Sequence, residues 1–140
     1  MQNPDNLRVA ADAKRLANAV YAFTRDFPKE ERFGLAAQMR RAAVSIGSNI
    51  FEGCGRQGKR GMESNASLRS FLYIAHGSSS ELLFQLRIAR RQQLGDPAKA
   101  ESVARLLAVL QGRLRRLILS LTRRMQLHTA SEASVLTGSR

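Results

Sequence analysis

The chain has 140 residues, which suits one domain with one core of ordinary size. Lysine and arginine total 23 against 11 acidic residues, and this net charge of +12 predicts a polyanionic partner, most often nucleic acid. A single cysteine, the absence of an apolar run of membrane length and an N-terminus without a secretory signal exclude the disulfide-rich, membrane and secreted classes, so we expect a cytoplasmic protein.

The first two predicted elements are amphipathic helices, because apolar residues recur in them at spacings of three and four. The first covers residues 5–27, where Phe27-Pro28 ends or bends it, and the second covers residues 29–53. Their predicted core positions are Ala13, Leu16, Val20, Phe23 and Phe27, then Leu35, Met39, Ala42, Ile46 and Ile50.

The second helix also carries a narrow polar strip, in which residues three or four apart lie close enough to touch. Two interpretations stay open: a small recognition surface, or a polar network that determines how the helices pack. The strip consists of Arg41, Ser45, Asn49 and Glu52, with Gln38 preceding them.

A glycine-rich stretch, "FEGCGRQGKRG" at residues 51–61, spells both G-x-G-x-x-G and G-x-x-x-x-G-K. Both nucleotide-binding motifs need a strand before them and a helix N-terminus after them, where free N–H groups meet phosphate. Here the preceding residues are helical, so Gly53 and Gly55 fall at a helix C-terminus, whose free carbonyls disfavour phosphate. We therefore interpret the stretch as a helix end followed by a basic turn. The predicted nucleic-acid contacts in this turn are Arg56, Lys59 and Arg60.

The third and fourth helices are predicted over residues 62–93 and 98–125, joined by the turn "LGDP". Ser78-Ser79-Ser80 followed by Glu81 also resembles a capping box, but the apolar pattern continues through Ser79 without a change of phase, which favours one continuous helix. The core positions are Leu68, Leu72, Ala75, Ser79, Leu82, Leu86 and Ala89, then Val103, Leu107, Leu110, Leu114, Leu117 and Leu121.

Four helices with short connections predict an all-α fold, an antiparallel up-down-up-down four-helix bundle over residues 1–125. Residues 126–140 are small and polar, and we expect them to form a flexible C-terminal tail. The second and third helices have another apolar stripe on the side away from the core. Scattered surface apolar residues are common, but this regular spacing favours a homo-oligomer interface. Its predicted members are Phe33, Val44, Phe51, Tyr73, Phe84 and Ile88.

The fourth helix concentrates positive charge. Residues 97–124 contain seven basic residues and only one acidic residue, Glu101, whereas a solvated face usually mixes both signs. We expect this face to lie along a phosphate backbone. Its predicted nucleic-acid contacts are Arg105, Arg115, Arg116 and Arg123.

Patterns typical of catalysis or metal binding are few. His76 and His128 are far apart and belong to no metal-binding motif. Basic neighbours favour the thiolate of Cys54, but no motif places a histidine beside it, so we interpret it as an ordinary loop thiol. We therefore expect no enzymatic activity, no metal and no cofactor.

Two stretches, "FPKEERFGLAAQMRRAAVSIGSNIFEGCGR" (27–56) and "SFLYIAHGSSSELLFQLRIARR" (70–91), resemble the bacterial family of 23S rRNA intervening-sequence proteins. The resemblance covers about residues 7–122, with Gly47 where proline is common and Cys54 where an aromatic residue is common. It implies a four-helix bundle that assembles into a homopentamer. It also links the chain to the accessory variability proteins of diversity-generating retroelements, which bind nucleic acid and a reverse transcriptase.

Charge and resemblance together favour a non-enzymatic accessory protein that binds RNA or DNA through arginines. The alternative is a scaffold that uses its basic surface to bind an acidic protein, such as a polymerase or a ribosomal component. Neither hypothesis involves a membrane.

Overall fold

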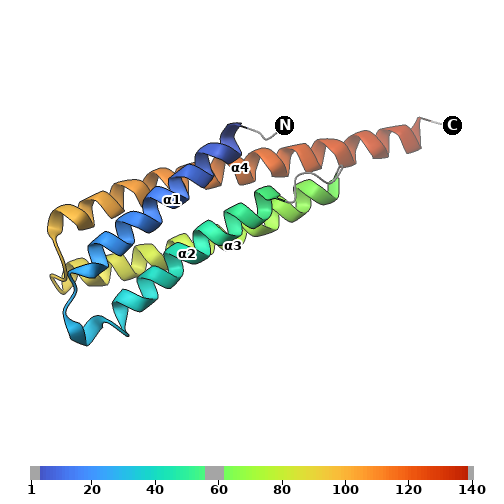
Figure 1. The fold of residues 1–140 in the computed structure, drawn as a ribbon. Helices are drawn as coiled ribbons and strands as arrows, with labels where there is room; N and C mark the ends of the chain where they lie inside the picture. Colours follow the sequence, from blue (N-terminus) through green and yellow to red (C-terminus); the bar gives the residue numbers. More distant parts are fainter. Residues whose placement is uncertain (1–3, 56–61, 139–140) are drawn as a thin grey trace.

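The computed structural model describes residues 4–55 and 62–138, which form four α-helices and no strand (Figure 1). The helices are α1 (Pro4–Arg25), α2 (Leu35–Gly55), α3 (Met62–Arg91) and α4 (Pro97–Thr137), with a short 3-10 helix, η1 (Lys29–Glu31), between α1 and α2. The prediction of an all-α fold with four helices is confirmed. Within the described ranges, no helix combines the length and apolarity that a membrane span requires.

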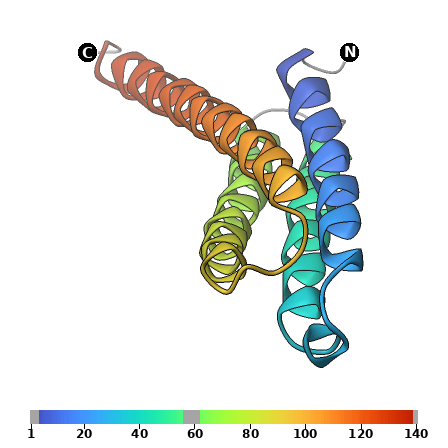
Figure 2. The same ribbon diagram turned by 90° about the vertical axis from the view of Figure 1, so that its left-hand side faces the viewer.

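Each helix packs against two others: α1 against α2 and α4, and α3 against α2 and α4. The α1–α2 and α3–α4 connections lie at the same end of the molecule in both views (Figures 1 and 2). Polar side chains join the helix pairs along their length. These contacts are Thr24–Arg40 between α1 and α2, Ser45–Ser78 between α2 and α3, Ser79–Gln111 and Arg90–Glu101 between α3 and α4, and Asp12–Arg113 between α1 and α4. Asp26, directly after α1, pairs with Lys99 of α4.

The predicted apolar positions form the core between the four helices. All of them are buried except Phe27 and Leu35, which are half-buried beside the core. Each large side chain that is fully buried, such as Phe23 or Leu72, contributes about 1.5–3 kcal/mol relative to exposure. Spacings of three and four in the sequence therefore identify most of the core, which Val9, Ala43, Ala100 and Ile118 complete.

The start of the second helix differs from the prediction. Pro28 is extended, with φ −55° and ψ 153°, and one 3-10 turn follows it, so α2 begins at Leu35 rather than at residue 29. The Glu31 carboxylate accepts a hydrogen bond from the Leu35 N–H at 3.2 Å, which satisfies a donor at the new helix start. Phe33 consequently lies in the connection before α2 rather than on the second helix.

The third helix is continuous through its serine run, as predicted. The hydroxyl of Ser79 donates to the carbonyl of His76 at 2.6 Å, and that of Ser80 donates to the same carbonyl at 3.3 Å. Both serines satisfy their hydroxyls within the helix, so they do not interrupt α3.

The fourth helix is longer than predicted. It starts at the N-cap Asp96, whose carboxylate accepts from the Ala98 N–H at 2.8 Å, and it continues to Thr137 rather than ending near residue 125. Residues 126–137 lose the apolar period but contain no glycine or proline, so nothing in them stops a helix. This segment extends past the other helices in Figure 1 and is exposed throughout.

Candidate nucleic-acid interface

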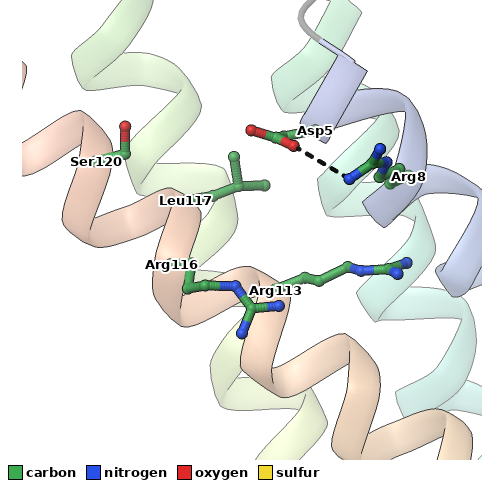
Figure 3. Close-up of a pocket in the computed structure, with 6 residues that line it drawn as sticks. All are labelled: Asp5, Arg8, Arg113, Arg116, Leu117 and Ser120. Carbon is green, nitrogen blue, oxygen red and sulfur yellow. Dashed lines mark ion pairs between the residues drawn. The ribbon is translucent and has the colours of Figure 1, made fainter.

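A small cavity lies between the start of α1 and the middle of α4 (Figure 3). Its volume is about 160 Å³. We call it the α1–α4 cavity, and its lining consists of Asp5, Arg8, Arg113, Arg116, Leu117 and Ser120. Three arginine side chains from two helices therefore meet at one hollow in the surface.

A shallow groove continues from this cavity along α4. Arg116 and Ser120 line both hollows, so the two form one continuous surface. We call the second part the α4 groove; it is lined by Arg116, Leu119, Ser120, Arg123, Arg124 and Leu127. The cavity and groove together present five arginines. Asp5 is the only acidic residue among the lining residues of the two hollows.

A buried carboxylate on α1 holds one of these arginines in place. The side chain of Asp12 is only 5% exposed and accepts a short hydrogen bond from the guanidinium of Arg113, which reaches across from α4. Arg15 approaches the other carboxylate oxygen of Asp12 at 3.4 Å. In Figure 3 the Arg113 side chain extends from α4 toward α1 on the side of Arg8. Burial of Asp12 is tolerated because its charge is paired and hydrogen-bonded.

The remaining arginines of the surface are held loosely or not at all. Arg8 and Asp5 are 4.0 Å apart, and both side chains are mostly exposed, so this pair contributes little. Among residues 4–55 and 62–138, no hydrogen bond or ion pair engages Arg116, Arg123 or Arg124. These three guanidinium groups are thus available to an external anion.

The predicted basic residues are distributed unevenly over the structure. All four predicted arginines of α4 are exposed, but only Arg116 and Arg123 line the continuous surface, whereas Arg105 and Arg115 lie outside it. Four further residues line this surface without having been predicted from the sequence: Arg8, Arg113, Ser120 and Arg124. The predicted basic turn with Arg56, Lys59 and Arg60 lies outside the described residues.

The polar strip of α2 makes its main contacts within the protein. The hydroxyls of Ser45 and Ser78 are 2.9 Å apart, which joins α2 to α3. The amide of Asn49 donates to the Ser45 carbonyl at 2.8 Å and lies 3.3 Å from the Ser45 hydroxyl. Arg41 and Glu52 are exposed at the surface. For Ser45 and Asn49 these contacts favour the packing interpretation.

The outer apolar stripe is exposed in the single chain. The predicted interface residues are between 36% and 87% exposed, and Ile74, which was not among them, is 53% exposed. The ammonium of Lys14 on α1 lies 5.3 Å from the centre of the Phe51 ring. The exposed members are Phe33, Val44, Phe51, Tyr73, Ile74, Phe84 and Ile88.

Groups of catalytic interest are either isolated or buried. Cys54 lies in the last turn of α2 rather than in a loop, and burial raises the pKa of its thiol instead of lowering it. Gly53 and Gly55 lie at the helix C-terminus as predicted, because α2 ends at Gly55. Across the described part of the chain, no three acidic, histidine or cysteine side chains cluster in a way that could hold a metal ion.

The fold and the surface define a strongly basic, all-α protein in which Arg116, Arg123 and Arg124 of α4 line one surface without a partner in the described residues. Residues 5–116 match the family described as 23S rRNA-intervening sequence protein, and because this match covers most of the chain, the protein belongs to that family. No curated protein matches the chain. The family match ends at Arg116, so Arg123, Arg124 and the rest of α4 lie beyond it.

Proposed function

We propose that this protein is a non-enzymatic accessory factor that binds RNA or DNA along the α1–α4 cavity and the α4 groove. The observation that supports the proposal is the continuous arginine surface, in which Arg116, Arg123 and Arg124 have no partner within the described chain. Guanidinium groups bind phosphate through paired N–H donors, so such a surface contacts the backbone and is largely indifferent to base sequence.

We also propose that the subunit is an antiparallel up-down-up-down bundle that assembles into a homo-oligomer. The interhelical contacts support this topology, since Asp12 pairs with Arg113 while the later Asp26 pairs with the earlier Lys99, an order that reverses along the chain. The exposed apolar stripe on α2 and α3 supports assembly, because a free subunit would leave several large apolar side chains in water. A pentamer is the assembly that the family resemblance implies.

The test of nucleic-acid binding is its dependence on salt. Fluorescence anisotropy with labelled single-stranded and duplex RNA and DNA measures affinity between 50 and 200 mM salt. If about six phosphates are neutralised, affinity falls about a thousandfold over this range. A response that is flat with salt, or no binding at 50 mM salt, contradicts the proposal.

A matched pair of variants locates the surface. The triple variant R116Q/R123Q/R124Q should reduce the slope of log affinity against log salt by about three. The control, R25Q/R87Q/R91Q, removes the same charge from exposed arginines at the opposite end of the molecule and should change the slope much less. Equal effects of the two triple variants would mean that binding depends on net charge alone.

The scaffold hypothesis keeps one specific observation in its favour. Leu119 and Leu127 are exposed within the α4 groove, and an acidic protein with apolar side chains would contact them as well as the arginines. A pull-down with nuclease treatment separates the two functions: partners that survive digestion support the scaffold, and partners lost on digestion support nucleic-acid binding.

A further inference from the structure

We infer that the α1–α4 cavity is a preorganised subsite for one phosphate group of the bound nucleic-acid strand, with Asp12 as the residue that positions its central arginine. This inference rests on the proposed function. It goes further because it assigns one phosphate to one cavity and gives a role to a buried acidic residue that touches no ligand.

The cavity has room for a phosphate group. A water molecule occupies about 30 Å³ in the liquid, so a cavity of about 160 Å³ accommodates a phosphate oxyanion in place of a few water molecules. The α4 groove is more open and extends away from the cavity, which leaves a path for the rest of a strand. A single anionic group therefore fits the more enclosed cavity, and a chain of such groups fits the more open groove.

The donors approach the cavity from two helices. Arg8 belongs to α1, whereas Arg113, Arg116 and the hydroxyl of Ser120 belong to α4 (Figure 3). An arginine presents its N–H donors in a rigid fork that matches two phosphate oxygens, and a serine hydroxyl donates one further hydrogen bond. Donors on two separate helices can surround a phosphate, which donors on one helix face cannot do.

The ion pair with Asp12 prepares Arg113 for binding. Because this buried carboxylate already fixes the guanidinium of Arg113, less side-chain freedom is lost when an anion arrives. The side chain of Arg113 lines the cavity and keeps 34% of its surface exposed, so the pair with Asp12 does not remove it from the cavity wall. Asp12 lines neither the cavity nor the groove, and its effect on a ligand passes through Arg113.

Asp5, in contrast to the arginines, weakens the binding of an anion in the cavity. Its carboxylate lies at the wall of the cavity, 4.0 Å from Arg8, and it repels any anion that enters. The pair is exposed and weak, so an incoming phosphate can take over Arg8 as its partner. The affinity of the cavity for phosphate is therefore the balance of three arginines against one nearby carboxylate.

The sharpest test uses a substitution for which the change in charge and the loss of positioning predict opposite changes in RNA affinity. Asp12→Asn makes the protein more positive, so a general electrostatic attraction predicts tighter binding of RNA. If Asp12 positions Arg113, binding becomes weaker instead, by about tenfold for one charge-assisted hydrogen bond lost to the ligand. Circular dichroism checks that the variant folds, and tighter binding by a folded variant overturns the role of Asp12.

The cavity itself is tested by substitutions that do not touch the buried pair. R8Q and S120A should each weaken binding of a single-stranded RNA oligonucleotide several-fold, whereas R25Q, on the same helix as Arg8, should have little effect. D5N should strengthen binding more than E30Q, which removes an equal charge at the other end of the molecule. Unchanged affinities in R8Q, S120A and D5N overturn the inference and leave the proposed function standing.

Inorganic phosphate is the probe that separates a backbone phosphate from a free anion. Phosphate is titrated into the protein while the Nε–H NMR signals of its arginines are recorded. Some of these signals should shift in the parent protein, and the same signals should be missing or should not shift in R8Q. Phosphate binding without any effect of R8Q on RNA would make the cavity a free-anion site and overturn its assignment to a strand. No binding of RNA or DNA at 50 mM salt would refute the proposed function and this assignment together, and no response to phosphate would refute the cavity alone.

Discussion

Two glycines six residues apart on α2 should respond in opposite ways to the same substitution. A Cβ added at Gly53 would lie 2.9 Å from the Cβ of Phe71 and 3.0 Å from a methyl group of Leu68, both on α3. Carbon atoms in good contact are about 3.5–4.0 Å apart, so Gly53→Ala forces an overlap of more than half an ångström. A methyl of Leu68 can rotate away, but the Cβ of Phe71 moves only with its backbone, so α2 and α3 must separate.

The expected magnitudes follow from overpacking and helix propensity. Overpacking a core typically costs about 1–3 kcal/mol, and alanine regains up to about 1 kcal/mol over glycine within a helix, so Gly53→Ala should destabilise by about 1–2 kcal/mol. At Gly47 the nearest atom to an added Cβ is the Cβ of Ala13 at 3.9 Å, an ordinary contact. Gly47→Ala should therefore stabilise the fold by up to about 1 kcal/mol.

Urea denaturation followed by circular dichroism, at one fixed protein concentration, measures both variants against the parent chain. The two free energies of unfolding should differ by about 1–3 kcal/mol, the sum of the two opposite effects. If Gly53→Ala is as stabilising as Gly47→Ala, then α2 and α3 do not approach each other as closely at Gly53 as described.

Three further predictions concern the buried pair, the thiol and the outer face. Arg113→Met leaves the Asp12 carboxylate buried without its main partner and should cost about 3 kcal/mol in urea denaturation, whereas the double variant D12L/R113M, which removes both charges, should recover much of that loss. The thiol of Cys54 should react with iodoacetamide more slowly at pH 8 than a free cysteine, because its raised pKa keeps it protonated. The reaction rate should rise only at higher pH, and a rate equal to that of the urea-unfolded chain would contradict this prediction. Phe84→Glu places a charge on the outer apolar face and should lower the mass measured by sedimentation to that of a single subunit. The control Leu127→Glu, at a similarly exposed site on α4, should leave the mass unchanged. Assembly that survives Phe84→Glu rejects that face as the interface.

The sequence predicts the core well because its signal is local. Spacings such as Leu107, Leu110 and Leu114 identify the buried side of one helix without reference to the others. The start of α2 was mistaken because the apolar period says nothing about the 3-10 turn after Pro28, and the end of α4 was mistaken because loss of amphipathicity is not a stop signal. Both errors concern where a helix begins or ends rather than whether it exists.

The cavity could not be predicted for a different reason. Arg8 and Arg116 are more than a hundred positions apart, and they meet only because α1 packs beside α4 in one particular register. That register depends on contacts between helices, such as the pair of Asp12 with Arg113, which no spacing within one helix reveals. In the sequence Arg113 is just another basic residue beside the leucine seam, so its role as the centre of a site becomes visible only in the folded chain.

The distribution of acidic residues explains why a basic chain has a localised basic surface. Asp12, Asp26 and Glu101 all pair with cations on neighbouring helices, so part of the negative charge is used to hold the helices together. None of these pairs reaches the stretch from Arg116 to Arg124, where positive charge remains uncompensated within the described structure. Uncompensated positive charge beside the groove favours the approach of a polyanion there. Five of the six residues that line this groove lie beyond the family match, so the family match says nothing about the charge of this part of α4.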